Sequence, residues 1–230
     1  MADSEQAVSA STTGGFEARW FATDLGAYRP CDFTYQAYAY DSVPPLDPAR
    51  YTGAFDWAGG GGAGEPLPEL VAELTALAED VSAHGLTLPP EFTAFQTGSH
   101  TSRLLDAVSV TACWTSLSRP LPSPVEPGAF LVRFLRDQQD CLHWYLYLRP
   151  TGEAFVVVSP VDHEADADAI PLEIRQQSIV WCAPSFEEFA HRFWIENCLW
   201  HEINGGGDAS RLEPQLRSYL DHYARQPAGA

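Results

Sequence analysis

Five acidic residues between positions 162 and 173 have the types and spacing of a calcium-binding loop. An EF-hand loop places oxygen ligands at positions 1, 3, 5, 7 and 12, needs a glycine at position 6, and follows a helix. Here position 6 is Ala167, Pro171 lies within the loop, and a predicted strand precedes it. We therefore favour a solvated acidic loop without a metal, formed by Asp162, Glu164, Asp166, Asp168 and Glu173.

Cys141 and His143 are the next candidates for chemistry, because residues two apart in a strand share one face. A thiolate nucleophile needs a nearby base and a lowered pKa. A core cysteine beside a hydrogen-bonded histidine explains the spacing equally well, and it is the interpretation we favour. The sequence has no C-x-x-C pair, H-E-x-x-H motif or G-x-S-x-G motif. We predict no catalytic residue, no metal site and no cofactor.

All 13 basic residues are arginines, and the absence of lysine excludes several reaction classes. A phosphate-binding P-loop requires its lysine. Schiff-base and pyridoxal phosphate enzymes require a lysine amine. None of these mechanisms is open to this chain.

The formal net charge of −18 indicates the kind of partner to expect. Nucleic-acid binding depends on clustered basic residues that neutralise phosphates, so a nucleic-acid partner is disfavoured. An acidic surface favours encounter with a basic protein, although the same charge also serves solubility alone. The candidate contacts for a protein partner are Asp137, Asp140, Asp162, Glu164, Asp166 and Asp168.

Composition predicts a folded chain outside membranes. Hydrophobic residues make up 45% of the sequence, and no apolar run approaches the roughly 18 residues of a membrane span. The N-terminus lacks the basic and apolar regions of a signal peptide. We therefore expect a cytoplasmic protein with no membrane partner.

The pattern of apolar residues predicts the elements that must position these side chains. Residues 1–15 are expected to be a disordered tail, and 16–64 an N-terminal extension whose strands add to the main sheet and which ends in a glycine-rich linker or loop. Helices are predicted over 66–83, from Pro89, and from a capping box at Ser185 and Glu188. Strands are predicted over 109–116, 130–135, 141–148, 155–159 and 179–183. Residues 226–230 are expected to be a second tail.

The helix from Ser185 has an apolar stripe that includes Phe186, Phe189 and Phe193, which is typical of packing against a core. Its charged residues lie on the other side, where solvent is expected, and are Glu187, Glu188, Arg192 and Glu196.

Several short motifs occur in the order seen in one known family. They are LPPEF over 88–92, FLVRFL over 130–135, CLHWYLYL over 141–148 and PSFEEF over 184–189, followed by the pairs Phe193-Trp194 and Leu199-Trp200. This order resembles the SUKH superfamily of small α+β domains, which includes many bacterial immunity proteins and a fungal cell-wall-synthesis regulator. The resemblance implies a domain over 65–225 with a mainly antiparallel sheet and helices packed on one side.

The resemblance also implies a protein-binding module, and it carries over no site residues. The function it favours is an immunity protein that neutralises a cognate toxin, for example a basic nuclease. The alternative is a regulatory or scaffolding domain of the same fold without a toxin partner. An unrecognised enzyme is the least favoured interpretation.

Overall fold

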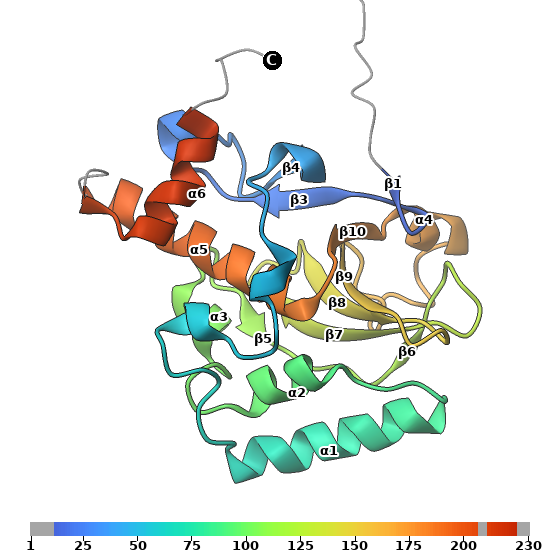
Figure 1. Cartoon of the computed structure of the whole chain (residues 1–230). Helices are drawn as coiled ribbons and strands as arrows, with labels where there is room; N and C mark the ends of the chain where they lie inside the picture. The colour runs from blue at the N-terminus through green and yellow to red at the C-terminus, as the bar shows by residue number, and fades with distance from the viewer. Residues whose placement is uncertain (1–11, 207–210, 225–230) are drawn as a thin grey trace, which may run out of the picture.

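A six-stranded antiparallel sheet lies at the centre of the computed structural model, which describes residues 12–206 and 211–224 (Figure 1). The strand order is β10 (Val180–Ala183), β9 (Ala154–Ser159), β8 (His143–Leu148), β7 (Phe130–Arg136) and β5 (Trp114–Thr115). The sixth strand, β6 (Leu121–Pro122), also pairs with β7. The longest helices are α1 (Pro68–Ala83) and α5 (Phe186–Asn204). Four shorter ones are α2 (Pro90–Thr97), α3 (Leu104–Val108), α4 (Leu172–Gln177) and α6 (Pro214–Ala224). The predicted α+β class with a mainly antiparallel sheet is confirmed.

Both faces of the central sheet are buried, which explains why its strands have near-continuous apolar sequences. On β8, Trp144 and Leu146 face a core that contains α1, α2 and α5. Tyr145 and Tyr147 alternate with them and face a second core, which includes Phe16 from the N-terminal segment. A strand with one solvated face would instead alternate apolar and polar residues.

The N-terminal segment is organised differently from the prediction. β3 (Arg19–Ala22) pairs with β4 (Gln36–Ala39) in a separate two-stranded sheet, linked to the central sheet by a single parallel bridge between Ala18 and Trp181. Within the expected tail over 1–15, β1 (Thr12–Thr13) pairs with β2 (Phe16–Glu17), so residues 12–15 are part of the fold. The expected tails over 1–11 and 226–230 lie outside the described residues.

The glycine-rich run over 59–64 is a packed turn rather than a linker. The amides of Ser99 and His100 donate to the carbonyls of Glu65 and Ala63, at 2.9 and 3.0 Å. A Cβ atom on Gly64 would lie 2.5 Å from the Ser99 hydroxyl, and φ at Gly64 is +78°. Glycine is therefore required here both by the close approach and by the backbone conformation.

The strand predicted over 109–116 is reduced to Trp114–Thr115, with α3 ending at Val108. Side chains capture the backbone amides that a strand would use. The Val110 amide donates to the Asn197 side chain at 2.9 Å, and the Cys113 amide donates to the Ser109 hydroxyl at 2.8 Å. Such side-chain bonds compete with a sheet ladder.

α5 is buried on nearly all sides, which sequence periodicity does not predict. Ser185 caps it as expected by accepting from the Glu188 amide at 3.2 Å. The four charged residues expected in solvent are each at most 5% exposed, and they are Glu187, Glu188, Arg192 and Glu196. The N-terminal segment and α6 cover them.

Glu196 is the centre of this buried polar contact. Its carboxylate accepts from the Trp20 indole at 2.9 Å, from two Arg29 nitrogens at 2.6 and 2.8 Å, and from the Tyr219 hydroxyl at 2.6 Å. Burial alone would raise the pKa of Glu196, but the Arg29 charge and these donors outweigh it and hold the pKa below its usual range. Glu196 therefore joins β3, the segment after it, and α6 to one helix.

We expect Glu196→Gln to lower the free energy of unfolding by about 3–5 kcal/mol, because it leaves the Arg29 guanidinium buried without its counter-charge. Urea unfolding followed by tryptophan fluorescence measures this change. Glu202→Gln is the matched control, since Glu202 is exposed on the same helix, and it should change stability by less than about 0.5 kcal/mol. Equal effects of the two substitutions would contradict the role assigned to Glu196.

Candidate interaction site

Arg133 draws two of the predicted contact residues together at one end of the sheet. It lies within β7 and is 5% exposed. One guanidinium nitrogen donates to both Asp162 oxygens, at 2.7 and 2.8 Å, and the other donates to Glu164 at 2.9 Å. Asp162 is itself buried, so it is not a surface contact as the sequence analysis proposed. The Asp162 carboxylate faces the interior and pairs with Arg133, because an arginine in an apolar strand needs a counter-charge.

Local hydrogen bonds give the acidic loop a fixed shape. The Asp162 carboxylate accepts from the amides of Glu164 and Ala165, at 2.9 and 3.4 Å. The Tyr145 hydroxyl accepts from the His163 amide at 3.0 Å and donates to the Val161 carbonyl at 3.1 Å. Burial alone would raise the pKa of Asp162, but the Glu164 amide and Arg133 outweigh it and lower the pKa. The loop is thus fastened to both β7 and β8.

Asp137 is a second predicted contact that the structure places inside. It is 1% exposed and lies in the turn between β7 and β8. Its carboxylate accepts from the Gln139 amide at 2.8 Å, the Cys141 thiol at 3.0 Å and the Tyr35 hydroxyl at 2.9 Å. Asp137 therefore shapes the turn and holds Tyr35, and it has no surface to offer a partner.

The other predicted contacts remain accessible. Asp140 pairs with Arg136, yet its side chain is 52% exposed. The Glu164 side chain is 35% exposed despite its bond to Arg133. Asp168 is exposed and Asp166 is half-buried. These four residues are the predicted contacts that remain at least partly accessible.

Cys141 and His143 do not form a nucleophile and base. Cys141 is exposed, so it is not the core cysteine expected from the sequence. Its thiol donates to Asp137, and partial burial together with that carboxylate raises the thiol pKa to about 12. The His143 imidazole instead lies 3.8 Å from an Asp162 oxygen and 3.9 Å from an Asp140 oxygen. Burial lowers the pKa of His143, so the ring is neutral at pH 7.

A calcium ion would need the carboxylate oxygens of the loop turned toward a common centre. Arg133 instead binds the oxygens of Asp162 and Glu164. Within residues 12–206 and 211–224, no group of three or more histidine, cysteine, aspartate or glutamate residues could hold a metal ion. The arginine takes the place that the EF-hand pattern gives to the ion.

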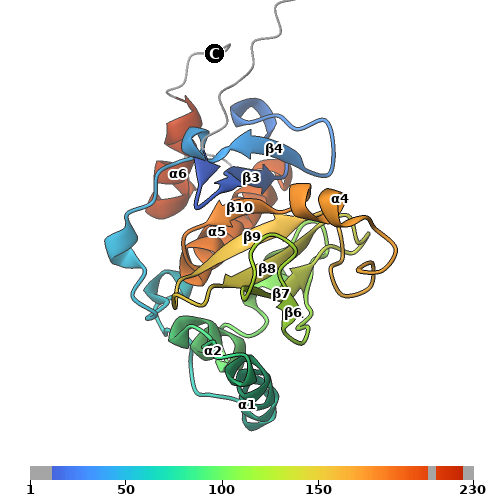
Figure 2. The same cartoon turned by 90° about the vertical axis from the view of Figure 1, so that its right-hand side faces the viewer.

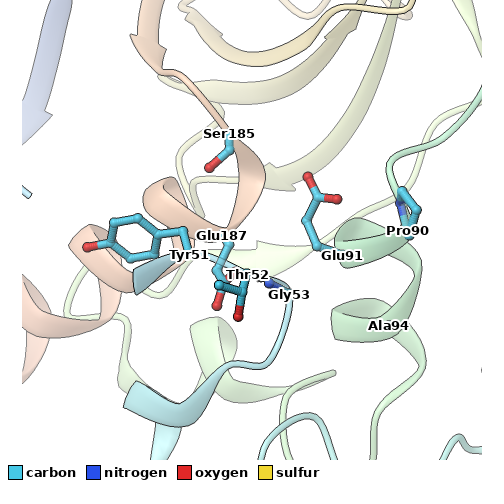
Figure 3. A pocket seen from close by; sticks show the side chains of 8 residues that line it. All are labelled: Tyr51, Thr52, Gly53, Pro90, Glu91, Ala94, Ser185 and Glu187. Carbon is cyan, nitrogen blue, oxygen red and sulfur yellow. Dashed lines mark hydrogen bonds between the residues drawn. The ribbon is translucent and has the colours of Figure 1, made fainter. Parts of the chain in front are cut away.

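A cavity of about 480 Å³ lies on another part of the molecule, between the first turns of α2 and α5 and the segment over 51–53 (Figure 3). Most of its polar groups already serve the fold. Glu187 accepts from the Gly53 and Phe55 amides and the Trp57 indole, and the Tyr51 hydroxyl bonds to His191 at 2.8 Å. The Glu91 carboxylate has no hydrogen bond to another described residue. Three separate segments form this cavity, so no local sequence motif indicates it.

No protein-family model, curated protein or solved structure matches this chain. Among the described residues, no helix is both long enough and apolar enough to cross a membrane.

We expect stability to fall as the pH decreases from 6.5 to 4, in part because of His163. An unfolded histidine binds a proton below about pH 6.5. In the folded protein, burial and then Arg175 lower the pKa of His163 to about 4. The unfolded state therefore binds more protons in this range, and acid favours unfolding. One such residue contributes a slope of about 1.4 kcal/mol per pH unit.

Urea unfolding of the His163→Gln variant at pH 7.5, 5.5 and 4.5 measures this contribution. The slope of unfolding free energy against pH should decrease by about that amount. His84→Gln is the control for replacing an exposed histidine, and its slope is compared with that of the His163 variant. An unchanged slope in the His163 variant would contradict the assignment.

Proposed function

We propose that this chain is a protein-binding module whose partner is a basic protein. The observation that carries the proposal is the net charge of −18, most of which remains outside the core. Among the described residues, three arginines and five carboxylates are buried, so burial there removes only −2 of this charge from the surface. Long-range attraction then speeds encounter with a basic partner, most strongly at low salt.

Within this class we propose an immunity protein that acts in the cytoplasm on a toxin such as a basic nuclease. The support is the resemblance to the SUKH superfamily, whose motifs fall on β7, β8 and the first turn of α5. The mechanism would be steric, with the acidic surface covering the nucleic-acid-binding face of the toxin. The resemblance supports the fold and the class of partner but assigns no contact residue.

The second candidate is a regulatory or scaffolding module of the same fold. The same acidic surface favours it, and it differs only in the identity of the partner. An enzyme of the thiol class is disfavoured because the Cys141 thiol is held protonated by Asp137, away from His143.

Co-expression with the product of the adjacent open reading frame tests the proposal. We expect a complex whose dissociation constant rises at least about tenfold between 50 and 300 mM NaCl, because salt screens the attraction. We also expect the chain to rescue cells from that product. Binding without any toxicity to rescue would favour the regulatory module, and neither binding nor rescue would contradict the immunity proposal.

A further inference from the structure

α4 presents two large apolar side chains to solvent directly after the acidic loop. Leu172 is 46% exposed and Ile174 is 54% exposed. Between them lies the exposed Glu173, and Asp168 is exposed four residues before Leu172. In two perpendicular views α4 lies at the periphery of the molecule, on the opposite side from α6 (Figures 1 and 2). An apolar centre with a charged rim is the composition of a protein interface.

This surface is built on fixed supports at both ends. Arg133 and Tyr145 hold the loop before α4, as described above. After Ile174, the side-chain amide of Gln176 donates to the Pro124 carbonyl at 2.7 Å. The Ser178 hydroxyl bonds to the Ser159 hydroxyl of β9 at 2.9 Å. A surface that is ordered before binding loses little conformational freedom when a partner docks. Leu172 and Ile174 are therefore presented on a formed platform rather than on a loose segment.

Charge selects the occupant of this surface. Segment 162–177 contains five carboxylates and one arginine, Arg175. Arg133 neutralises Asp162 and shares Glu164, which leaves Asp166, Asp168 and Glu173 as the other carboxylates of the segment. A second copy of this chain also carries a net charge of −18 and is therefore repelled. A segment with basic residues flanking apolar ones is complementary in both respects.

We propose that residues 164–174, the α4 surface, dock a basic amphipathic segment of the partner protein, with Leu172 and Ile174 as the apolar anchors. This inference rests on the proposed function as a module for basic proteins. It replaces the buried Asp137 and Asp162 with Leu172, Glu173 and Ile174 among the contact residues. Buried apolar anchors inside a charged rim carry most of the affinity of such interfaces.

Peptide titration of the ¹⁵N-labelled full chain tests the site without a known partner. The probe is the peptide Ac-LRRLLRRL-NH₂ at 150 mM NaCl. The comparison peptides are Ac-LEELLEEL-NH₂, which reverses the charge, and Ac-GRRGGRRG-NH₂, which removes the apolar residues. We expect amide shifts to concentrate in 164–175 with the first peptide, and at least about tenfold weaker binding of the other two.

Two double variants separate the apolar and charged contributions. Leu172→Ser with Ile174→Ser, and Asp168→Asn with Glu173→Gln, should each weaken binding of the first peptide at least about tenfold. Val71→Ser is the apolar control, because Val71 is 39% exposed on α1. Glu79→Gln with Asp80→Asn is the charge control, because it makes the same change in net charge at exposed positions of α1. Both controls should bind as the unmodified chain does, and circular dichroism verifies that every variant folds.

The outcomes separate this inference from the proposed function. Shifts outside 164–175, no shifts at all, or α4 variants that bind like the controls would overturn the α4 surface. Self-association of the unmodified chain that the Leu172 and Ile174 variant abolishes would assign the surface to a second copy, and would also overturn it. If the adjacent gene product binds the unmodified chain and both α4 variants equally, the proposed function stands without this site. If that product fails to bind while the peptide maps to 164–175, the site stands without the immunity function.

Discussion

The buried carboxylate of Glu196 determines how the N-terminal segment and α6 are arranged around α5. A charge removed from water is tolerated only with close counter-charges and donors. Those partners are Trp20 and Arg29 from the N-terminal segment and Tyr219 from α6. The opposite face of α5 packs Phe186 and Phe189 against the central sheet. One helix therefore joins the central sheet to the N-terminal segment and α6.

The central sheet and its helices are predictable because their signals are local. Continuous apolar runs identify β7, β8 and β9, and the apolar stripe of α1 is clear in the sequence. The burial of the charged side of α5 cannot be predicted from the local sequence. Glu187 and Glu196 look solvent-exposed by periodicity, and their tryptophan partners, Trp57 and Trp20, lie 130 and 176 residues away in the sequence. Aromatic residues in the N-terminal segment indicate that this segment is buried, but the sequence pattern does not indicate which element they pack against.

The acidic loop itself was predictable, whereas the direction of each carboxylate was not. Arg133 within the apolar run FLVRFL is the signal that could have been used, because a buried guanidinium requires an acid nearby. Aspartate is a common turn residue, and Asp137 lies in the turn between β7 and β8, where it accepts from the Gln139 amide. Leu172 and Ile174 are not predictable as a surface, because two apolar residues near a proline carry no periodicity. Their exposure is a property of the folded loop alone.

The long sequence distance between the partners of α5 has a consequence during synthesis. Trp20, Phe55 and Trp57 leave the ribosome well before the helix that covers them. At 5–20 residues per second, the interval between residues 57 and 196 is roughly 7 to 28 s. Throughout that time Trp20 and Trp57 lack the α5 carboxylates that accept their indole hydrogen bonds in the folded protein. The order of translation thus delays these contacts until α5 has been synthesised.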